Sequence, residues 1–185
     1  IAIGQNAIRN ITTDASNVAV GAAAGYYMEN VGATNRYNTY IGTGAGNKSY
    51  KGSNQTYIGG QAGWHATGSN NTFVGKQAGY GGTTSAPFSS GEANTAVGYN
   101  ALKAFTTAGS NTVVGYESAR VVTTGGGNVL MGYYSGQYLT TGDKNIYIGG
   151  YAGAGNHEGD YNVFIGHESG LGAANNTRFK NVSIG

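Results

Sequence analysis

The densest group of metal-capable side chains lies in two neighbouring segments near the C-terminal end. His157, Glu158 and Asp160 form the first segment, and His167 and Glu168 form the second. Imidazole binds transition metals and carboxylate binds hard cations, so a site would form if the fold brought both segments together. However, His167 and Glu168 occupy positions at which equivalent segments carry Tyr, Lys or Gln. This pattern is typical of a solvated loop, and the sequence predicts no metal site.

Signatures of catalysis are missing from the sequence. No Ser lies in a Gly-x-Ser-x-Gly elbow, and no His-Glu-x-x-His occurs. The glycines Gly42, Gly44 and Gly46 resemble part of a phosphate loop, but no Gly-Lys-Ser/Thr follows them. With eight carboxylates and no Cys in 185 residues, candidate acid–base pairs are few and a thiolate site is excluded. We therefore expect neither enzymatic activity nor a cofactor.

Composition excludes several other classes of protein. Ten Lys and Arg against eight Asp and Glu give a net charge of +2, which predicts neither nucleic acid nor an anionic membrane as partner. No apolar run approaches the roughly 20 residues of a membrane span. The 35 Gly exclude a helical bundle, the single Pro excludes collagen, and 15 Tyr argue against disorder.

A short phrase, Asn-Thr/Val-x-Ile/Val-Gly, recurs along the whole chain. Its closing glycines are Gly4, Gly21, Gly42, Gly59, Gly75, Gly98, Gly115, Gly132, Gly149, Gly166 and Gly185. Six of the ten spacings are 17 residues, with longer inserts before Gly42, Gly98 and Gly185. The sequence predicts one repeat domain over residues 1–185. Because it begins and ends within the phrase, we expect a segment of a longer fibrous protein.

Each phrase predicts a short β-strand that ends at the glycine. β-Branched residues dominate the position before the glycine and the position two residues earlier, which predicts that these two columns point into a narrow core. Three residues after each glycine stands Ala or Ser, as tight stacking of coils requires. The phrase-opening Asn predicts a hydrogen-bonded ladder, with Gln55 as its one substitute. Thr107, Thr124 and their equivalents predict a second strand upstream.

These features predict an all-β protein: a parallel β-solenoid, or β-roll, of about ten coils of 17 residues. Ten coils of about 4.8 Å give a rod roughly 50 Å long.

The residue between the two β-branched columns is predicted to face outward. Because this middle column carries no charge, we expect it to be covered, either by a second layer within the coil or by another molecule. We favour another molecule, and therefore a homo-oligomer that associates laterally or end to end. The self-association candidates are Tyr40, Tyr57, Phe73, Val113, Leu130, Tyr147 and Phe164.

The inserts are the predicted place for ligand specificity, since solenoid insertions often lie on the binding face. The insert within 26–36 carries Tyr26 and Tyr27, and the insert within 80–93 carries Pro87 and Phe88. We take Tyr26, Tyr27 and Phe88 as candidates for binding a cell-surface glycan or receptor. A further run of Tyr follows the glycines at 99, 116 and 133–134, with Tyr151 near it, and either stacks on sugars or packs along the rod.

Segments 94–102 and 71–79, which read NTAVGYNAL and NTFVGKQAG, resemble glycine-rich repeats of phage tail-fibre-like proteins and of trimeric autotransporter adhesin (YadA-like) heads. The resemblance covers the whole chain. It implies a left-handed β-roll, usually trimeric, that projects from a cell or virion surface. Those head repeats are nearer 14 residues in length, whereas these are 17 with insertions.

Three functions follow as expectations. The first is a structural module of an extracellular fibre or filament, such as a tail-fibre or adhesin shaft. The second is a receptor- or glycan-binding head that mediates attachment. The third is an ice-binding solenoid, suggested by the unbroken ladder Thr39, Thr56, Thr72, Thr95 and Thr112. Our assignment of that ladder to the core argues against the third.

Overall fold

The computed structural model describes residues 1–9, 16–28, 36–83, 85, 88–172 and 179–185. Within these residues the chain forms strands, turns and loops, without a helix. The strands are β1 (Ala2–Ile3), β2 (Val18–Val20), β3 (Thr39–Ile41), β4 (Thr56–Ile58), β5 (Thr72–Val74), β6 (Thr95–Val97), β7 (Thr112–Val114), β8 (Val129–Met131), β9 (Ile146–Ile148), β10 (Val163–Ile165) and β11 (Val182–Ile184). Each strand ends where its glycine follows.

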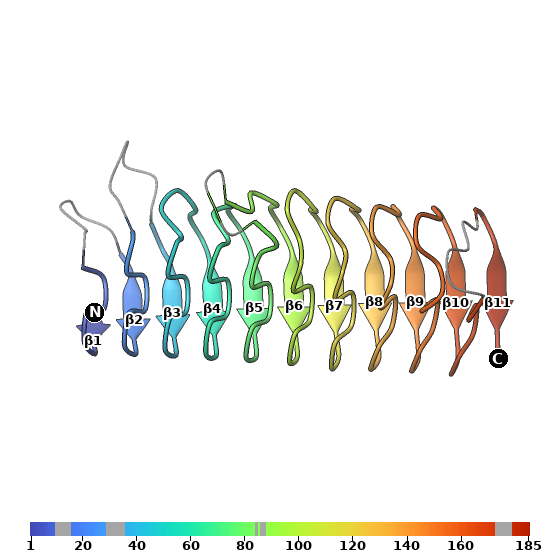
Figure 1. The fold of residues 1–185 in the computed structure, drawn as a ribbon, viewed down its shortest axis with the longest axis horizontal. Coiled ribbons are helices and arrows are strands. Elements are labelled where there is room, and N and C mark those ends of the chain that lie inside the picture. Colours follow the sequence, from blue (N-terminus) through green and yellow to red (C-terminus); the bar gives the residue numbers. More distant parts are fainter. Residues whose placement is uncertain (10–15, 29–35, 84, 86–87, 173–178) are drawn as a thin grey trace.

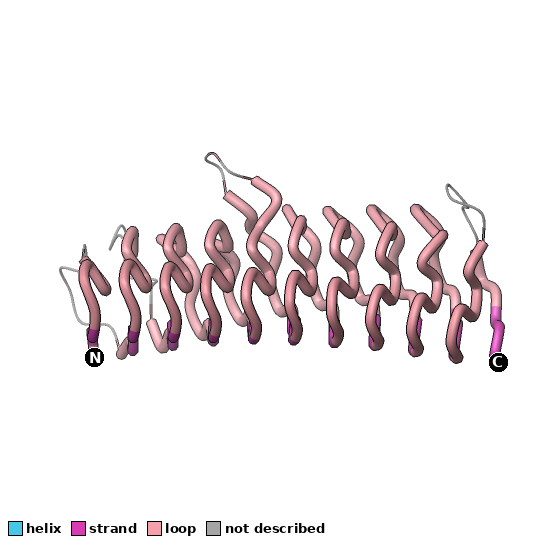
Figure 2. Tube along the Cα trace, turned by 60° about the horizontal axis from the view of Figure 1, so that its bottom comes forward, coloured by secondary structure: helices cyan, strands magenta, loops and turns pink. Residues whose placement is uncertain are grey.

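All eleven strands belong to one parallel sheet, in chain order from β1 to β11 (Figure 1). Equivalent residues pair without slippage: Tyr40 lies beside Tyr57, and Leu130 beside Tyr147. The rest of each coil is turn and loop (Figure 2). The predicted parallel β-solenoid is therefore confirmed, whereas its handedness and the trimer stay predictions.

The described residues form no second sheet opposite the first. Their only pairing outside β1–β11 is the isolated bridge between Ala66 and Ser89, so the second strand predicted at the Thr column is wrong for the described residues. Loop carbonyls link the coils there instead, as in the bond from Thr123 N to Thr140 O at 2.8 Å. Three members of that column, at positions 13, 34 and 177, lie outside the described residues.

The predicted orientation of the strands is wrong, because the middle residue of each strand points into the coil. The seven self-association candidates are fully buried: Tyr40, Tyr57, Phe73, Val113, Leu130, Tyr147 and Phe164. The aromatic members stack along the rod in two runs: Tyr40 on Tyr57 at 5.3 Å and Tyr57 on Phe73 at 4.9 Å between centroids, and Tyr147 on Phe164 at 5.0 Å. The middle column is thus the core of the molecule, and its side chains cannot meet a second copy in this structure.

Space for the aromatic rings comes from glycines six residues further along. Gly63 follows Tyr57 and has a φ of +58°. A Cβ at Gly63 would lie 2.4 Å from the Tyr57 ring, and a Cβ at Gly79 would lie equally close to Phe73. The ring therefore occupies the volume that a side chain at the glycine would need.

Buried amides tie neighbouring coils together, as the Asn column predicts. Asn128 donates from its backbone N and from Nδ2 to Asn111 Oδ1, at 2.9 and 3.0 Å, and from Nδ2 to Gly142 O at 2.8 Å. Asn145 makes the same bonds to Asn128. The left-handed backbone conformation falls one residue before the Asn, for example at Lys144 with a φ of 55°. This ladder satisfies polar groups that the narrow core would otherwise leave unpaired.

Two further predictions about the columns are confirmed. The strand-closing glycines have φ between 117° and 141°, and a Cβ at Gly59 would lie 2.6 Å from the carbonyl of Gly75. The small residues three positions later are almost all buried. Among them, Ser118 donates from Oγ to Leu130 O at 3.1 Å, which links one turn to the next strand.

Candidate binding surfaces

The outer face of the sheet carries the two columns predicted to form the core. Their side chains are half-buried or exposed, with exposed fractions of 36% at Val97, 37% at Met131 and 39% at Ile41. In β3–β7 a Thr and an aliphatic residue share this face, whereas in β2 and β8–β11 both residues are aliphatic, and none of its positions from β2 to β11 is charged. Over ten strands spaced by about 4.8 Å, the uncharged strip is about 45 Å long. We call it the outer sheet face.

A second surface is formed by the residues five and six positions after each strand-closing glycine, and we call it the lateral wall. Its described residues are Arg9, Tyr26, Tyr27, Asn47, Lys48, Trp64, His65, Tyr80, Gly81, Lys103, Ala104, Arg120, Val121, Gln137, Tyr138, Ala154, Gly155, Leu171 and Gly172. Most are aromatic, basic or small, and no Asp or Glu occurs among them. Three cavities open on this wall.

The first cavity combines two of the three predicted ligand-binding residues. Tyr27 and Phe88 line it together with Lys48 and Tyr50, and its volume is about 250 Å³. Lys48 Nζ lies 3.4 Å from the centroid of the Tyr27 ring, and Tyr50 meets Phe88 edge to face at 5.8 Å. The third predicted residue, Tyr26, packs edge to face on Tyr27 at 4.5 Å. Pro87, in the same insert as Phe88, lies outside the described residues.

His65 holds this cavity's insert against the rod. Its imidazole stacks on Phe88 at 5.4 Å and meets Tyr80 edge to face at 5.1 Å. Burial, and after it the charge of Lys48, lowers the pKa of His65 from its usual value of 6.5. The neutral imidazole is therefore the form that the fold favours.

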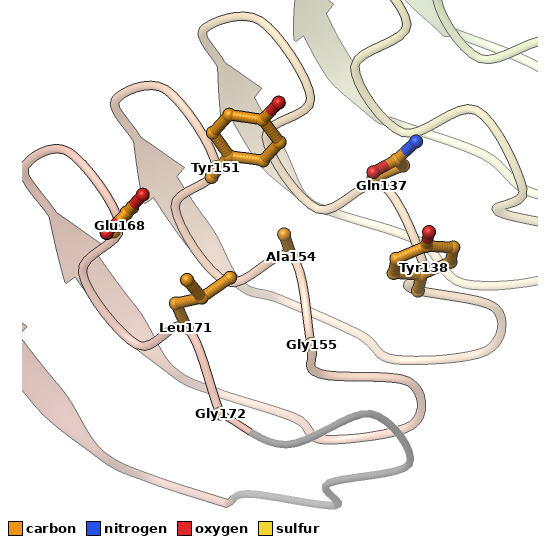
Figure 3. A pocket seen from close by; sticks show the side chains of 8 residues that line it. All are labelled: Gln137, Tyr138, Tyr151, Ala154, Gly155, Glu168, Leu171 and Gly172. Atoms are coloured by element: carbon orange, nitrogen blue, oxygen red, sulfur yellow. The ribbon is translucent and has the colours of Figure 1, made fainter.

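The second cavity lies near the C-terminal end and is drawn in Figure 3. It is about 310 Å³ in volume. Its lining side chains are Gln137, Tyr138, Tyr151, Ala154, Glu168 and Leu171, with Gly155 and Gly172. From the sequence, Glu168 is considered and rejected as a metal ligand and Tyr151 is assigned to a tyrosine run, but neither residue is placed in a cavity.

The third cavity lies between the first two along the wall. Its volume is about 280 Å³, and Tyr80, Lys103 and Arg120 line it with small residues. Arg120 also contacts Glu117, with 3.6 Å between Nε and Oε2. This carboxylate neutralises part of the cavity's positive charge.

The tyrosine run packs along the rod while keeping part of each ring in solvent. Tyr99 stacks on Tyr116 at 5.3 Å, and Tyr134 stacks on Tyr151 at 5.2 Å. Tyr116 is 49% exposed and Tyr133 is 47% exposed. Packing along the rod thus accounts for the run, and it also fixes the orientation of each ring.

The metal-capable residues are not brought together into a cluster. No group of three or more His, Cys, Asp or Glu residues could hold a metal ion within the part of the chain that the structure describes. His157 stacks on Tyr138 at 5.7 Å, whereas His167 Nε2 lies 3.8 Å from Glu168 Oε1. Nor do the described residues form a helix that could cross a membrane.

No protein-family model matches the chain, and neither a curated protein nor a solved structure matches it. The resemblance to tail-fibre and adhesin repeats therefore stays a prediction, and functional inference rests on the surfaces described above.

Proposed function

We propose that this chain is a structural module of an extracellular fibre, and that it associates with copies of itself through the outer sheet face. The observation that carries the proposal is the uncharged face that runs across ten strands. Contiguous apolar surface of this extent marks an interface on soluble proteins. A second sheet packs face to face at about 10 Å, which suits side chains of the size of Thr, Val and Ile.

Lateral association is tested by placing a carboxylate in the middle of the outer sheet face. Val97→Glu combined with Met131→Glu, two strands apart, should convert the oligomer or filament into monomer, because burying two unpaired charges opposes association. Both side chains are partly exposed, so the monomer should still fold. Mass measurement by light scattering and electron microscopy of the purified chain give the readout.

Lys103→Glu, on the lateral wall, is the matched control and should leave the assembly intact. A wild-type chain that stays monomeric at high concentration would contradict the proposal. So would a double variant that assembles as the wild type does.

A second candidate function is attachment to a receptor or glycan through the first cavity. It is favoured because Tyr27 and Phe88, from two separate inserts, line the same cavity beside Lys48. An aromatic wall with one cation suits an acidic sugar. Binding to a glycan array that disappears in Tyr27→Ala and Phe88→Ala would support this function, and unchanged binding would remove it.

Ice binding is a third candidate, since the argument against it relied on an inward Thr ladder. Thr39, Thr56 and Thr72 instead lie in register on the outer sheet face. Thermal hysteresis that Thr72→Lys abolishes would support ice binding. Hysteresis near zero in the wild type would exclude it.

A further inference from the structure

The second cavity exists because one coil of the lateral wall lacks large side chains. The coil after β9 carries Ala154 and Gly155 at positions where the coil after β8 carries Gln137 and Tyr138. On the other side, the coil after β10 contributes Leu171 and Glu168. Figure 3 shows Ala154 between these two groups of larger side chains. The cavity is thus a notch at Ala154, the one small residue among the described residues that stand five positions after a strand-closing glycine.

Aromatic rings bound the notch, and their own packing holds them in place. Tyr151 stacks on Tyr134 with 5.2 Å between centroids and meets Tyr133 edge to face at 5.0 Å. Tyr138 stacks on His157 and remains 44% exposed. Because the rings are fixed before a ligand arrives, binding costs little side-chain entropy.

The polar groups of the notch suit hydroxyl groups rather than anions. Glu168 supplies carboxylate oxygens that accept hydrogen bonds, and the Gln137 amide both donates and accepts. Among the residues that the structure describes, no Lys or Arg lines this cavity. A phosphate or a sugar carboxylate would meet the charge of Glu168 without a cation from these residues to offset it.

We propose that this notch binds a neutral hexopyranose unit of a glycan. Its volume of about 310 Å³ lies at the small end of ligand pockets, which are about 300–1,000 Å³. Aromatic and aliphatic walls match the C–H faces of a sugar ring, while the carboxylate and amide match its hydroxyl groups. This activity is independent of self-association, because the notch lies on the lateral wall and not on the outer sheet face.

Titration with neutral sugars, followed by ¹H–¹⁵N NMR on the full chain with the two Glu substitutions of the outer sheet face, tests the proposal, because a filament would broaden the amide signals beyond detection. Glucose, galactose, mannose and N-acetylglucosamine are the probes, with sialyllactose and oligo-dT as anionic comparisons. We expect saturable shifts in residues 137–138, 151–155 and 168–172 for a neutral sugar, with a Kd on the order of 1 mM. Fluorescence of Trp64, which does not line the notch, should not change.

The sharpest variant is Ala154→Gln, which fills the notch with the side chain that the neighbouring coil carries. It should weaken sugar binding at least about tenfold, since the added side chain occupies the ligand's volume. Arg120→Gln places the same residue in the same column outside the notch and should leave binding unchanged. Tyr151→Phe should retain binding, because the ring remains, whereas Tyr151→Ala should lose it.

Three outcomes would overturn the inference. One is the absence of shifts at neutral-sugar concentrations roughly ten times the expected Kd. Another is binding confined to sialyllactose or oligo-dT. The last is equal binding by the wild type and the Ala154→Gln variant, which would place the sugar elsewhere. None of these results bears on oligomer mass, so the fibre proposal is judged separately.

Discussion

Side-chain volume inside the coil is balanced between the middle residue of a strand and the residue six positions later. Where the middle residue is aromatic, as at Tyr57 or Phe73, the later residue is Gly. Where the middle residue is Ala96, the later residue is Leu102, and both are fully buried. In these coils a large residue at one position accompanies a small one at the other, whereas Ala19 and Gly25 are both small and Met28 packs against Gly25 instead.

This balance predicts that Gly63→Ala destabilises the protein by about 1–3 kcal/mol. The new methyl group would lie 2.4 Å from the Tyr57 ring, and the backbone at Gly63 has a φ of +58°. Gly60→Ala is the matched control, because a Cβ there meets no atom within 4 Å. Its effect should stay within about 0.5 kcal/mol. Urea denaturation of both variants measures the difference, and equal stabilities would refute the packing argument.

At the scale of the strand, the sequence repeat predicts where the strands lie but not which side of each strand faces the core. Strands β2 to β11 each span three residues, so alternation places one residue on one side and two on the other without showing which side is buried. β-Branched residues favour strands on either face, which is why their columns were assigned to the core. The pairing of aromatic middle residues with later glycines is the signal that would have corrected the assignment. It is visible in the sequence once the repeats are aligned.

The candidate sites could be predicted only in part, because loops place them. Aromatic composition identified Tyr27 and Phe88, yet their common cavity depends on Phe88 lying beside the coils that carry Tyr27 and Lys48. The notch at Ala154 depends on what a coil lacks compared with both neighbours. A missing side chain can be recognised as a binding site only when the structure shows that neighbouring coils form one continuous surface around it.

The packing of Phe88 and its insert against His65 should become less stable as the pH falls. The pKa of His65 is lowered from 6.5, so below pH 6.5 the unfolded chain takes up a proton that the folded chain resists. The stability linked to His65 is therefore complete above pH 6.5 and falls as the pH drops toward the lowered value. Amide-exchange protection factors, which are corrected for the intrinsic pH dependence of exchange, should fall in residues 64–66 and 88–90 over that range. His65→Phe keeps the stacked ring without its proton, and its protection factors should not fall in this way; if they do, another group is responsible.

At the scale of the molecule, the rod has no wide core, and each coil depends on its neighbours. The amide ladder, the ring stack and the sheet all run parallel to the rod, so each interaction joins one coil to the next. The ladder varies at Gln55, whose backbone N donates to Asn38 Oδ1 at 2.9 Å while its side chain bonds Tyr40 and Ser49. A defect in the middle should then cost more than the same defect near an exposed strand.

Asn128→Ala and Asn181→Ala test this dependence within one column. Asn128 is fully buried, and its replacement leaves Asn145 N and Gly142 O without the bonds that its side chain supplies. Asn111 Oδ1 loses the bond from Nδ2 but still accepts one from the backbone N of residue 128. At about 1–3 kcal/mol for each of the two unsatisfied buried groups, the loss should be about 2 kcal/mol or more.

Asn181 makes the same two bonds to Asn162 Oδ1, each at 3.0 Å, but its side chain is exposed, so water can replace them. Its replacement should cost no more than about 1 kcal/mol. Thermal and urea unfolding give the two stabilities, and hydrogen exchange shows how far the disturbance spreads from each site. Because coupling between coils transmits the defect, Asn128→Ala should raise exchange in β7 and β9 as well as in β8. Equal losses of stability, or a disturbance confined to β8, would mean that the coils are stabilised individually and that the ladder adds little to the continuity of the rod.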